Sequence, residues 1–211
     1  MDCNLKNNSF CQLTIEESHF NNSEMYLNDF TGSHIKKVFF MKAVIESCLF
    51  EKSEILDCSY NEIHFLKNTS FWDSNISNTS FVKSRLKKCN YCASKIKSSS
   101  FEDVISHELD FDESEIKKTI FNGANVTNNS FDHVFFEDTS WIATKIQNTQ
   151  YIDAQFIEAR FEGAELRDVT FARSKLKKIT FESSIMKDVN FEGTILSKYS
   201  LESLSNMKNK L

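Results

Sequence analysis

Two cysteines in the segment Cys89-Asn-Tyr-Cys92 have the CxxC spacing of redox disulfides and of half a zinc site. No second cysteine pair follows at zinc-finger spacing, and no βαβ pattern surrounds the pair. The sequence contains no HExxH motif and no glycine-rich phosphate loop, and its five histidines are scattered. These residues predict no catalytic, cofactor or metal site, so we expect a protein that is not an enzyme.

The element that carries these residues follows a spacing that neither a helix nor a single strand uses. In the segment FEGAELRDVTF, the large apolar residues Phe161, Leu166 and Phe171 lie five positions apart. Helices bury residues every three or four positions and strands every two, so a step of five places successive side chains on different faces of either element. The chain itself must turn to bring them together.

This five-residue spacing extends over almost the whole chain. All positions from Leu5 to Phe65 in steps of five are apolar, and from Phe71 to Leu201 only Ser106 is polar. Eighteen of the twenty phenylalanines fall in this frame. A second column, two residues before the first, holds Ser, Thr, Ala, Cys or Val at 32 of its 40 positions. We therefore expect one large and one small residue of every five to point inward.

One pentapeptide is about the length of a β-turn with a short extended link, so four of them would close one square coil of twenty residues. Aromatic and aliphatic central residues alternate, so the aromatic ones are predicted to stack on two opposite sides of the square. About ten coils, each rising by roughly 4.8 Å, would make a rod of about 50 Å. The predicted fold class is all-β.

Two pentapeptides show the repeat most clearly, GANVT at 123–127 and GAELR at 163–167, and each of the four glycines follows a central phenylalanine by two positions. The chain resembles the pentapeptide-repeat family over about residues 3–201. This resemblance implies a right-handed quadrilateral β-helix. A turn with positive φ would favour glycine at those four positions.

Two places depart from the repeat. Between Phe65 and Phe71 the frame slips by one residue, which we assign to the segment LKNTS within residues 61–70. Within residues 102–110, Ser106 takes a central position next to Ile105. We predict a one-residue bulge at the first place and a local register shift at the second, and either could instead be a functional protrusion.

The end of the sequence breaks the five-residue spacing. Leu201, Leu204 and Leu211 have helical spacing, and Ser200 is a candidate N-cap. We therefore divide the chain into a β-helix over residues 1–200 and a helical element over 201–211.

The helical element has two interpretations. A solenoid end needs a cap, so a short capping helix is the first. The family resemblance implies the second, because members that bind DNA gyrase use a similar element to join two rods. The chain is expected to be a monomer or a homodimer formed through a terminus.

Composition limits the possible partners and location. Thirty acidic and 25 basic residues give a net charge of -5, which argues against a general nucleic-acid-binding protein. No apolar run could cross a bilayer and the segment MDCNLKNNSF has no signal-peptide pattern, so we expect a bacterial-type cytoplasmic protein without membrane contact. The six cysteines should then be reduced, with Cys89 pointing inward and Cys92 outward.

Two outward surfaces are candidates for protein binding. The first is an acidic face, which could mimic DNA and which comprises Asp112, Glu113, Asp132 and Asp153. Alternatively, charged residues of consecutive coils could simply pair with one another and solvate the walls. The second surface is apolar, since exposed apolar clusters often mark partner sites. It comprises Phe135, Ile142, Ile152 and Ile157 around one zone of the rod, with Trp72 and Val82 as a smaller group.

The predicted function is that of a non-enzymatic protein-interaction module or scaffold with an unidentified protein partner. The family resemblance implies an alternative, a DNA mimic that binds the type II topoisomerase DNA gyrase and protects it from inhibitors. We expect no cofactor and no direct contact with nucleic acid.

Overall fold

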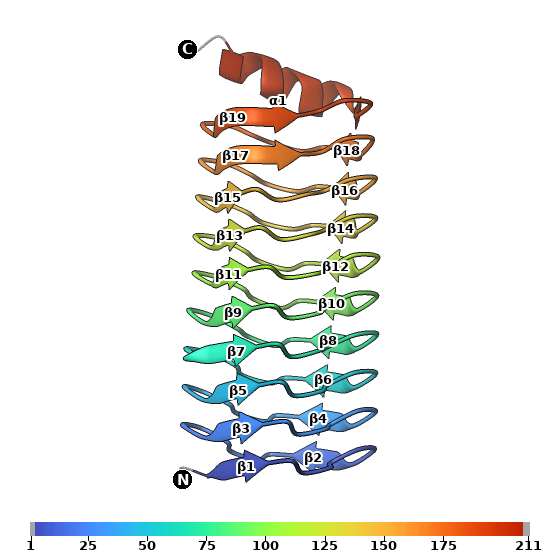
Figure 1. Cartoon of the computed structure of the whole chain (residues 1–211). Coiled ribbons are helices and arrows are strands. Elements are labelled where there is room, and N and C mark those ends of the chain that lie inside the picture. Colours follow the sequence, from blue (N-terminus) through green and yellow to red (C-terminus); the bar gives the residue numbers. More distant parts are fainter. Residues whose placement is uncertain (1–2, 209–211) are drawn as a thin grey trace.

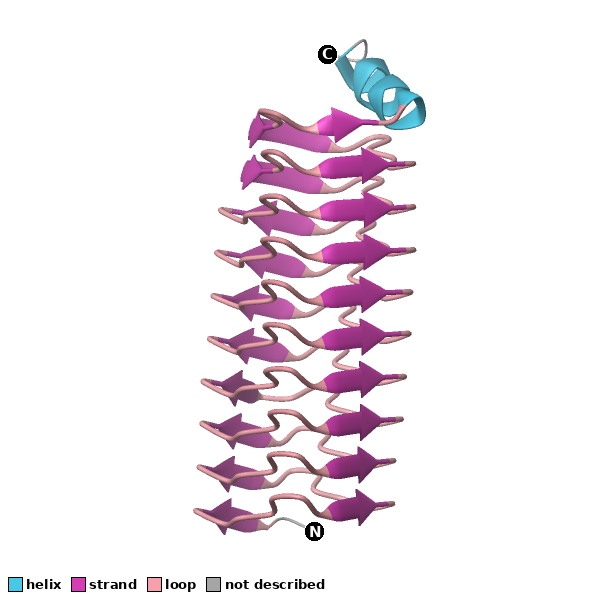
Figure 2. Ribbon diagram, turned by 90° about the vertical axis from the view of Figure 1, so that its right-hand side faces the viewer, coloured by secondary structure: helices cyan, strands magenta, loops and turns pink. Residues whose placement is uncertain are grey.

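Backbone hydrogen bonds between residues about twenty positions apart wind the chain into a straight stack of coils (Figure 1). The computed structural model describes residues 3–208, and their side chains from residue 3 to residue 206. Every coil gives one strand to each of two ten-stranded parallel sheets on opposite sides of the stack (Figure 2). The predicted right-handed quadrilateral β-helix of about ten coils is confirmed.

The strands are short because each side of the square is short. The odd sheet consists of β1 (Asn4–Lys6), β3 (Glu24–Tyr26), β5 (Val44–Glu46), β7 (Phe65–Lys67), β9 (Arg85–Lys87), β11 (Ile105–His107), β13 (Asn125–Thr127), β15 (Lys145–Gln147), β17 (Glu165–Thr170) and β19 (Ile185–Asn190). The even sheet consists of β2 (Thr14–Glu16), β4 (His34–Lys36), β6 (Glu54–Leu56), β8 (Asn75–Ser77), β10 (Lys95–Lys97), β12 (Glu115–Lys117), β14 (Phe135–Glu137), β16 (Gln155–Ile157), β18 (Lys175–Lys177) and β20 (Ile195–Leu196).

Stacked aromatic rings fill the other two sides, as the alternation of aromatic and aliphatic residues predicted, but Phe136 and Phe156 break the alternation and stack on the even sheet at 4.3 Å. The Phe111 side carries Phe10, Phe30, Phe50, Phe71, Tyr91, Phe111, Phe131, Tyr151, Phe171 and Phe191. The Phe121 side carries Phe20, Phe40, Tyr60, Phe81, Phe101, Phe121, Trp141, Phe161 and Phe181. Ring centroids along the ladders are 4.0 Å apart at the closest pair, Phe121 and Trp141, and 5.7 Å at the widest, Trp141 and Phe161.

The small inward residues tie each coil to the one before it. Ser53 Oγ donates a hydrogen bond to the carbonyl oxygen of Phe30 at 2.8 Å, and Thr144 Oγ1 donates to that of Phe121 at 2.9 Å. Cys58 replaces the hydroxyl with a thiol, whose Sγ lies 3.4 Å from the Ile35 carbonyl oxygen. Ser and Thr in this column add a second donor to carbonyls that already accept a backbone N–H, since Phe30 O accepts that of Ser33 at 3.1 Å and Phe121 O that of Ala124 at 3.2 Å.

Each corner of the coil requires a left-handed residue. Every described residue two positions after a central residue has positive φ, from Asn7 to Gly193. The sequence predicts positive φ only at the four glycines. At Gly123 the lack of a side chain also matters, because a Cβ would lie 2.5 Å from Asp103 Oδ1. Positive φ disfavours L residues by about 1 to 2 kcal/mol each, so the coil bonds must offset this cost at many corners.

The extra residue of the frame slip lies earlier than predicted. The N–H of His64 donates to the Ala43 carbonyl at 3.1 Å, yet it is Phe65 that stands opposite Val44 in the strand register. His64 and Phe65 thus oppose one residue of the preceding strand, which is a β-bulge. The assignment of the extra residue to LKNTS was wrong, and so was the inward position of Phe65. Leu66 is the buried central residue.

The predicted register shift at Ser106 is also wrong. Ser106 is buried in the central column, paired with Leu86 on one side and Val126 on the other, and Ile105 points outward. Asn129 Nδ2 donates to Ser106 Oγ at 2.7 Å, so the polar side chain is satisfied inside the rod. The unbroken register follows from the backbone ladder, which continues whatever the central side chain is.

The helix α1 (Lys198–Lys208) lies across the last coil, where the sequence predicted a cap (Figure 1). It begins before the predicted boundary at residue 201, and its N-cap is Ser197, whose Oγ accepts the N–H of Ser200 at 3.3 Å. The predicted N-cap Ser200 instead donates from its Oγ to the Leu176 carbonyl at 3.0 Å and accepts the Ile179 N–H at 3.0 Å. The Ser200 side chain thus hydrogen-bonds to backbone groups of the last coil that no further coil can pair.

The apolar residues of this element have different positions. Leu204 packs against the core, whereas Leu201 is exposed, so the prediction that Leu201 continues the central column was wrong. Leu211 lies outside the described residues. Of residues 3–208, no helical segment is both long and apolar enough to span a membrane.

Candidate protein-binding surfaces

The CxxC cysteines lie in different environments, as the repeat predicts. Cys89 is buried and its Sγ lies 3.3 Å from the Leu66 carbonyl oxygen, whereas Cys92 is half-buried on the Phe111 side, 3.4 Å from Asp110 Oδ1. Burial raises the pKa of Cys89 to about 12, and desolvation together with Asp110 raises the pKa of Cys92 to about 12. Both thiols stay protonated at neutral pH, which makes them poor nucleophiles.

The described residues offer little else for catalysis. No three His, Cys, Asp or Glu side chains within residues 3–208 are placed to hold a metal ion. The interior cavity beside Ser106 has a volume of only about 10 Å³, room for about one water molecule. A larger space of about 370 Å³ is a shallow depression along the corner formed by Glu108, Asn128 and Asn148. What the rod offers to a partner is its outer wall.

The four acidic residues of the predicted DNA-mimicking face all lie on the Phe111 side. Asp112 and Asp132 occupy the same column on consecutive coils, and each carboxylate uses one oxygen for the backbone of the next coil. Asp112 Oδ1 accepts the N–H of Asp132 at 2.9 Å, and Asp132 Oδ1 accepts the N–H of Ile152 at 2.9 Å. Burial raises the pKa of Asp132, and the neighbouring charge of Asp112 acts in the same direction.

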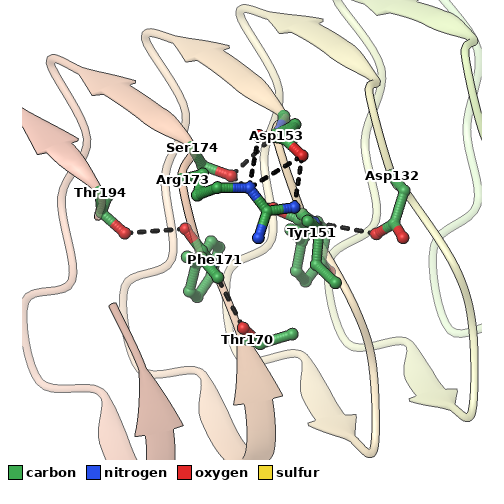
Figure 3. A network of polar contacts seen from close by, with 11 residues as sticks. Asp132, Tyr151, Asp153, Thr170, Phe171, Arg173, Ser174 and Thr194 are labelled. Atoms are coloured by element: carbon green, nitrogen blue, oxygen red, sulfur yellow. Dashed lines mark hydrogen bonds and ion pairs between the residues drawn. The ribbon is translucent and has the colours of Figure 1, made fainter. Parts of the chain in front are cut away.

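Arg173 limits the acidic face at its C-terminal end. Its guanidinium makes a two-pronged ion pair with Asp153, with Nε 3.0 Å from Oδ1 and Nη2 2.6 Å from Oδ2 (Figure 3). The hydrogen bond from Arg173 lowers the pKa of Asp153. The free negative charge is therefore concentrated at Asp112, Glu113 and Asp132, and Asp153 contributes to a neutral pair.

The predicted apolar residues do not form one patch. Phe135 and Ile157 lie on the even sheet, Ile142 on the Phe121 side and Ile152 on the opposite Phe111 side, and all four are only half-exposed. A step of ten residues crosses the rod, so Ile142 and Ile152 face away from each other. Trp72 and Val82 are separated in the same way, on the Phe111 and Phe121 sides.

Cations cover two of the outward aromatic rings. Lys52 Nζ lies 5.0 Å from the Trp72 ring centroid, and Lys117 Nζ lies 5.1 Å from that of Phe135. Lys117 also pairs with Glu137 of the next coil at 3.3 Å, the kind of pairing between coils that the sequence suggested. These aromatic residues are therefore engaged with the wall itself.

Two exposed apolar residues that the sequence analysis did not select lie together on the odd sheet. Phe65 on β7 is 45% exposed and Ile105 on β11 is 51% exposed. They occupy the same outward column, with Arg85 of β9 between them. The signal is present in the sequence, since these residues mark the two departures from the repeat, but the five-residue frame places Phe65 inside and Ile105 in a shifted register.

Comparison with known families agrees with this geometry. A model described as a pentapeptide repeat region matches residues 114–191, and the same coil geometry continues on both sides of the match. Residues 114–191 are a pentapeptide repeat region. No curated protein matches its sequence significantly.

Solved structures similar to this chain are distant in sequence. HetL of the cyanobacterium Nostoc sp. strain PCC 7120, involved in heterocyst differentiation regulation, is 10% identical, covering 92% of this chain and 87% of HetL with a TM-score of 0.46. A trypsin-treated variant of QnrB1, a plasmid-mediated fluoroquinolone resistance protein, is 16% identical, covering 100% and 98% with a TM-score of 0.41. Such low identities say nothing about function.

Proposed function

We propose that this protein is a non-enzymatic protein-interaction module that binds its partner through the odd sheet. The observation that carries the proposal is the exposed pair Phe65 and Ile105, which stand on either side of Arg85 in a single column. Apolar residues grouped with an arginine and projecting from a rigid wall are typical of interface hot spots. The filled interior and the protonated thiols support a binding role over a catalytic one.

Site-specific photocrosslinking tests this proposal in cells. A photoreactive residue is placed at one outward position per side at mid-height: Ile105, Lys97, Asp112 and Glu102. A discrete crosslinked species from Ile105, absent from the other three, supports binding through the odd sheet. A discrete species from another side would keep the interaction function and move its surface. The absence of any discrete species from all four positions would contradict an interaction module.

A second candidate function is a DNA mimic that binds DNA gyrase. The observation that favours it is the group of Asp112, Glu113 and Asp132, whose charges have no ion-pair partner among residues 3–208. Titration of the protein into a gyrase supercoiling reaction, with and without a fluoroquinolone, tests it. The double variant Asp112→Asn and Asp132→Asn is the matched control, because the Asn122 amide oxygen accepts the equivalent backbone N–H, that of Ile142, at 2.9 Å. No effect of the parent protein at micromolar concentration would exclude this candidate.

A further inference from the structure

The two interruptions of the repeat have one common result, an exposed apolar residue on the odd sheet. The bulge at His64 leaves Phe65 outside the core, and the buried Ser106 leaves its neighbour Ile105 outside. They are separated by two coils and by a single residue in their column, Arg85. The surface formed by Phe65, Arg85, Ile105 and the adjacent Lys67 and Lys87 is here termed the odd-sheet patch.

The odd-sheet patch is basic in a chain of net charge -5. The outward positions of β7, β9 and β11 hold two apolar residues, three cations and His107, and none is acidic. Lys67 pairs with Glu46 at 2.9 Å, but Arg85 and Lys87 have no ion-pair partner among residues 3–208. An acidic partner would therefore meet unpaired cations at the centre of the patch.

The spacing of the patch selects the form of that partner. Consecutive strands are about 4.8 Å apart, so Phe65 and Ile105 are separated by about 10 Å along the rod. An α-helix rises 1.5 Å per residue, so residues i and i+7 lie on one face about 10.5 Å apart, with i+3 and i+4 between them. A helix lying along the rod axis would place apolar residues on Phe65 and Ile105 and an acidic residue at Arg85.

Other occupants match the patch less well. An added β-strand needs a free sheet edge, whereas the backbone groups of β7, β9 and β11 are already paired on both sides. Nucleic acid would be attracted by the cations, but its phosphate backbone offers no apolar side chains to cover Phe65 and Ile105. We propose that the odd-sheet patch binds an acidic amphipathic helix of a partner protein. This inference rests on the proposed interaction function.

A peptide selection tests the inference directly, since it needs only the full chain as bait. A display library of helical 18-residue peptides is selected on the full chain and counter-selected on the variant Arg85→Glu. We expect enriched peptides with apolar residues at i and i+7 and Asp or Glu at i+3 or i+4. Their affinity, measured by fluorescence anisotropy, should fall at least tenfold for Arg85→Glu and for Ile105→Ser.

The matched control is Ile185→Ser, because Ile185 lies in the same outward column, four coils away, and is 59% exposed. It should leave peptide affinity unchanged, and thermal melting should show all three variants folded. The inference would be overturned if the selected helices lacked acidic residues or if no sequence pattern were enriched. It would also be overturned if Ile105→Ser bound the peptides with the same affinity as the parent chain. So would binding of duplex DNA or phosphatidylserine vesicles that depends on Arg85. A crosslink from another side of the rod would preserve the interaction function while this inference failed.

Discussion

The carboxylate of Asp132 accepts a hydrogen bond from the backbone N–H of Ile152 in the next coil, at 2.9 Å. Asn122 makes the same contact to the N–H of Ile142 at 2.9 Å on the opposite side of the rod. An amide oxygen therefore serves at this position as a carboxylate oxygen does, so the contact does not depend on the negative charge. Structural and functional roles of the acidic face can be separated by this distinction.

Replacing Asp132 by Asn should leave the free energy of unfolding at pH 7 unchanged or higher, whereas Asp132→Ala should lower it by about 1 kcal/mol through loss of the hydrogen bond. Because burial raises the pKa of Asp132 in the folded state, its charge is disfavoured there, and this unfavourable contribution is removed as pH falls through the raised pKa toward 3.8. Urea unfolding over a pH series from 7 down to 3.8 measures both effects. Equal losses for Asn and Ala would show that the charge itself is structural.

Replacing Tyr91 by Phe should stabilise the protein. Tyr91 is fully buried in the Phe111 ladder and its hydroxyl has no hydrogen-bond partner among residues 3–208, as is also true of Tyr60 and Tyr151. A buried unpaired hydroxyl disfavours folding by about 1 to 3 kcal/mol, so its removal should raise the unfolding free energy by about 1 kcal/mol. Chemical denaturation measures the gain, with the partly exposed Tyr26→Phe as the control that should change little. A loss for Tyr91→Phe would show that a water molecule inside the rod binds the hydroxyl.

Replacing Leu27 by Gly should also stabilise the protein, although it removes a large side chain. Leu27 has φ +55° and is 55% exposed, so its backbone is disfavoured and its side chain buries little. Relief of the left-handed conformation should contribute about 1 kcal/mol, less the entropy that glycine loses on folding. Leu49→Gly is the matched control, since Leu49 is exposed outside the corner positions and its replacement should be destabilising. The melting temperature should be higher for Leu27→Gly than for Leu49→Gly, and the reverse order would contradict the prediction.

The ion pair of Asp153 and Arg173 should stabilise the folded state at neutral pH and lose this effect at acid pH. The pKa of Asp153 is lowered from its ordinary value of 3.8 by the hydrogen bond from Arg173. The contribution is therefore fully present above pH 3.8 and is lost as pH falls through the lowered value. In Arg173→Gln, NMR titration should show the Asp153 pKa moving back up. Glu158, whose pKa is lowered by Lys178, should not change, and an unmoved Asp153 would contradict the role given to Arg173.

The fold could be predicted from the sequence because one rule repeats. The alternation of aromatic and aliphatic central residues determines which rings stack, and the small column determines where the coils approach. The bulge could not be placed, because Phe65 and Leu66 are both apolar and either could fill the central position. The aliphatic neighbours Ile45 and Leu86 decide the choice for Leu66, and they become its neighbours only when the coils are stacked.

The surfaces could be predicted only in part, because the sequence shows which residues point outward and not which are already engaged. The four acidic residues lie on one side of the rod, yet Arg173 follows Asp153 by twenty positions and neutralises it. Ile142 and Ile152 are close in sequence and on opposite sides of the rod. The capping helix was predicted, but its first residue was not, because Ser197 and Ser200 are equally good caps by type.

The bulge at His64 changes the sequence separation of residues that contact each other in neighbouring coils. Residues that touch between coils are twenty positions apart along most of the chain, but they are twenty-one apart wherever the interval spans His64, as Ile45 and Leu66 are. Pairs of coupled substitutions should therefore be twenty residues apart, or twenty-one where the interval between them spans His64. A duplicated or deleted block of twenty residues would change the length of the rod while every side kept its alignment. An insertion of five residues between Phe65 and Ile105 would rotate all later residues by a quarter turn and divide the odd-sheet patch between two sides.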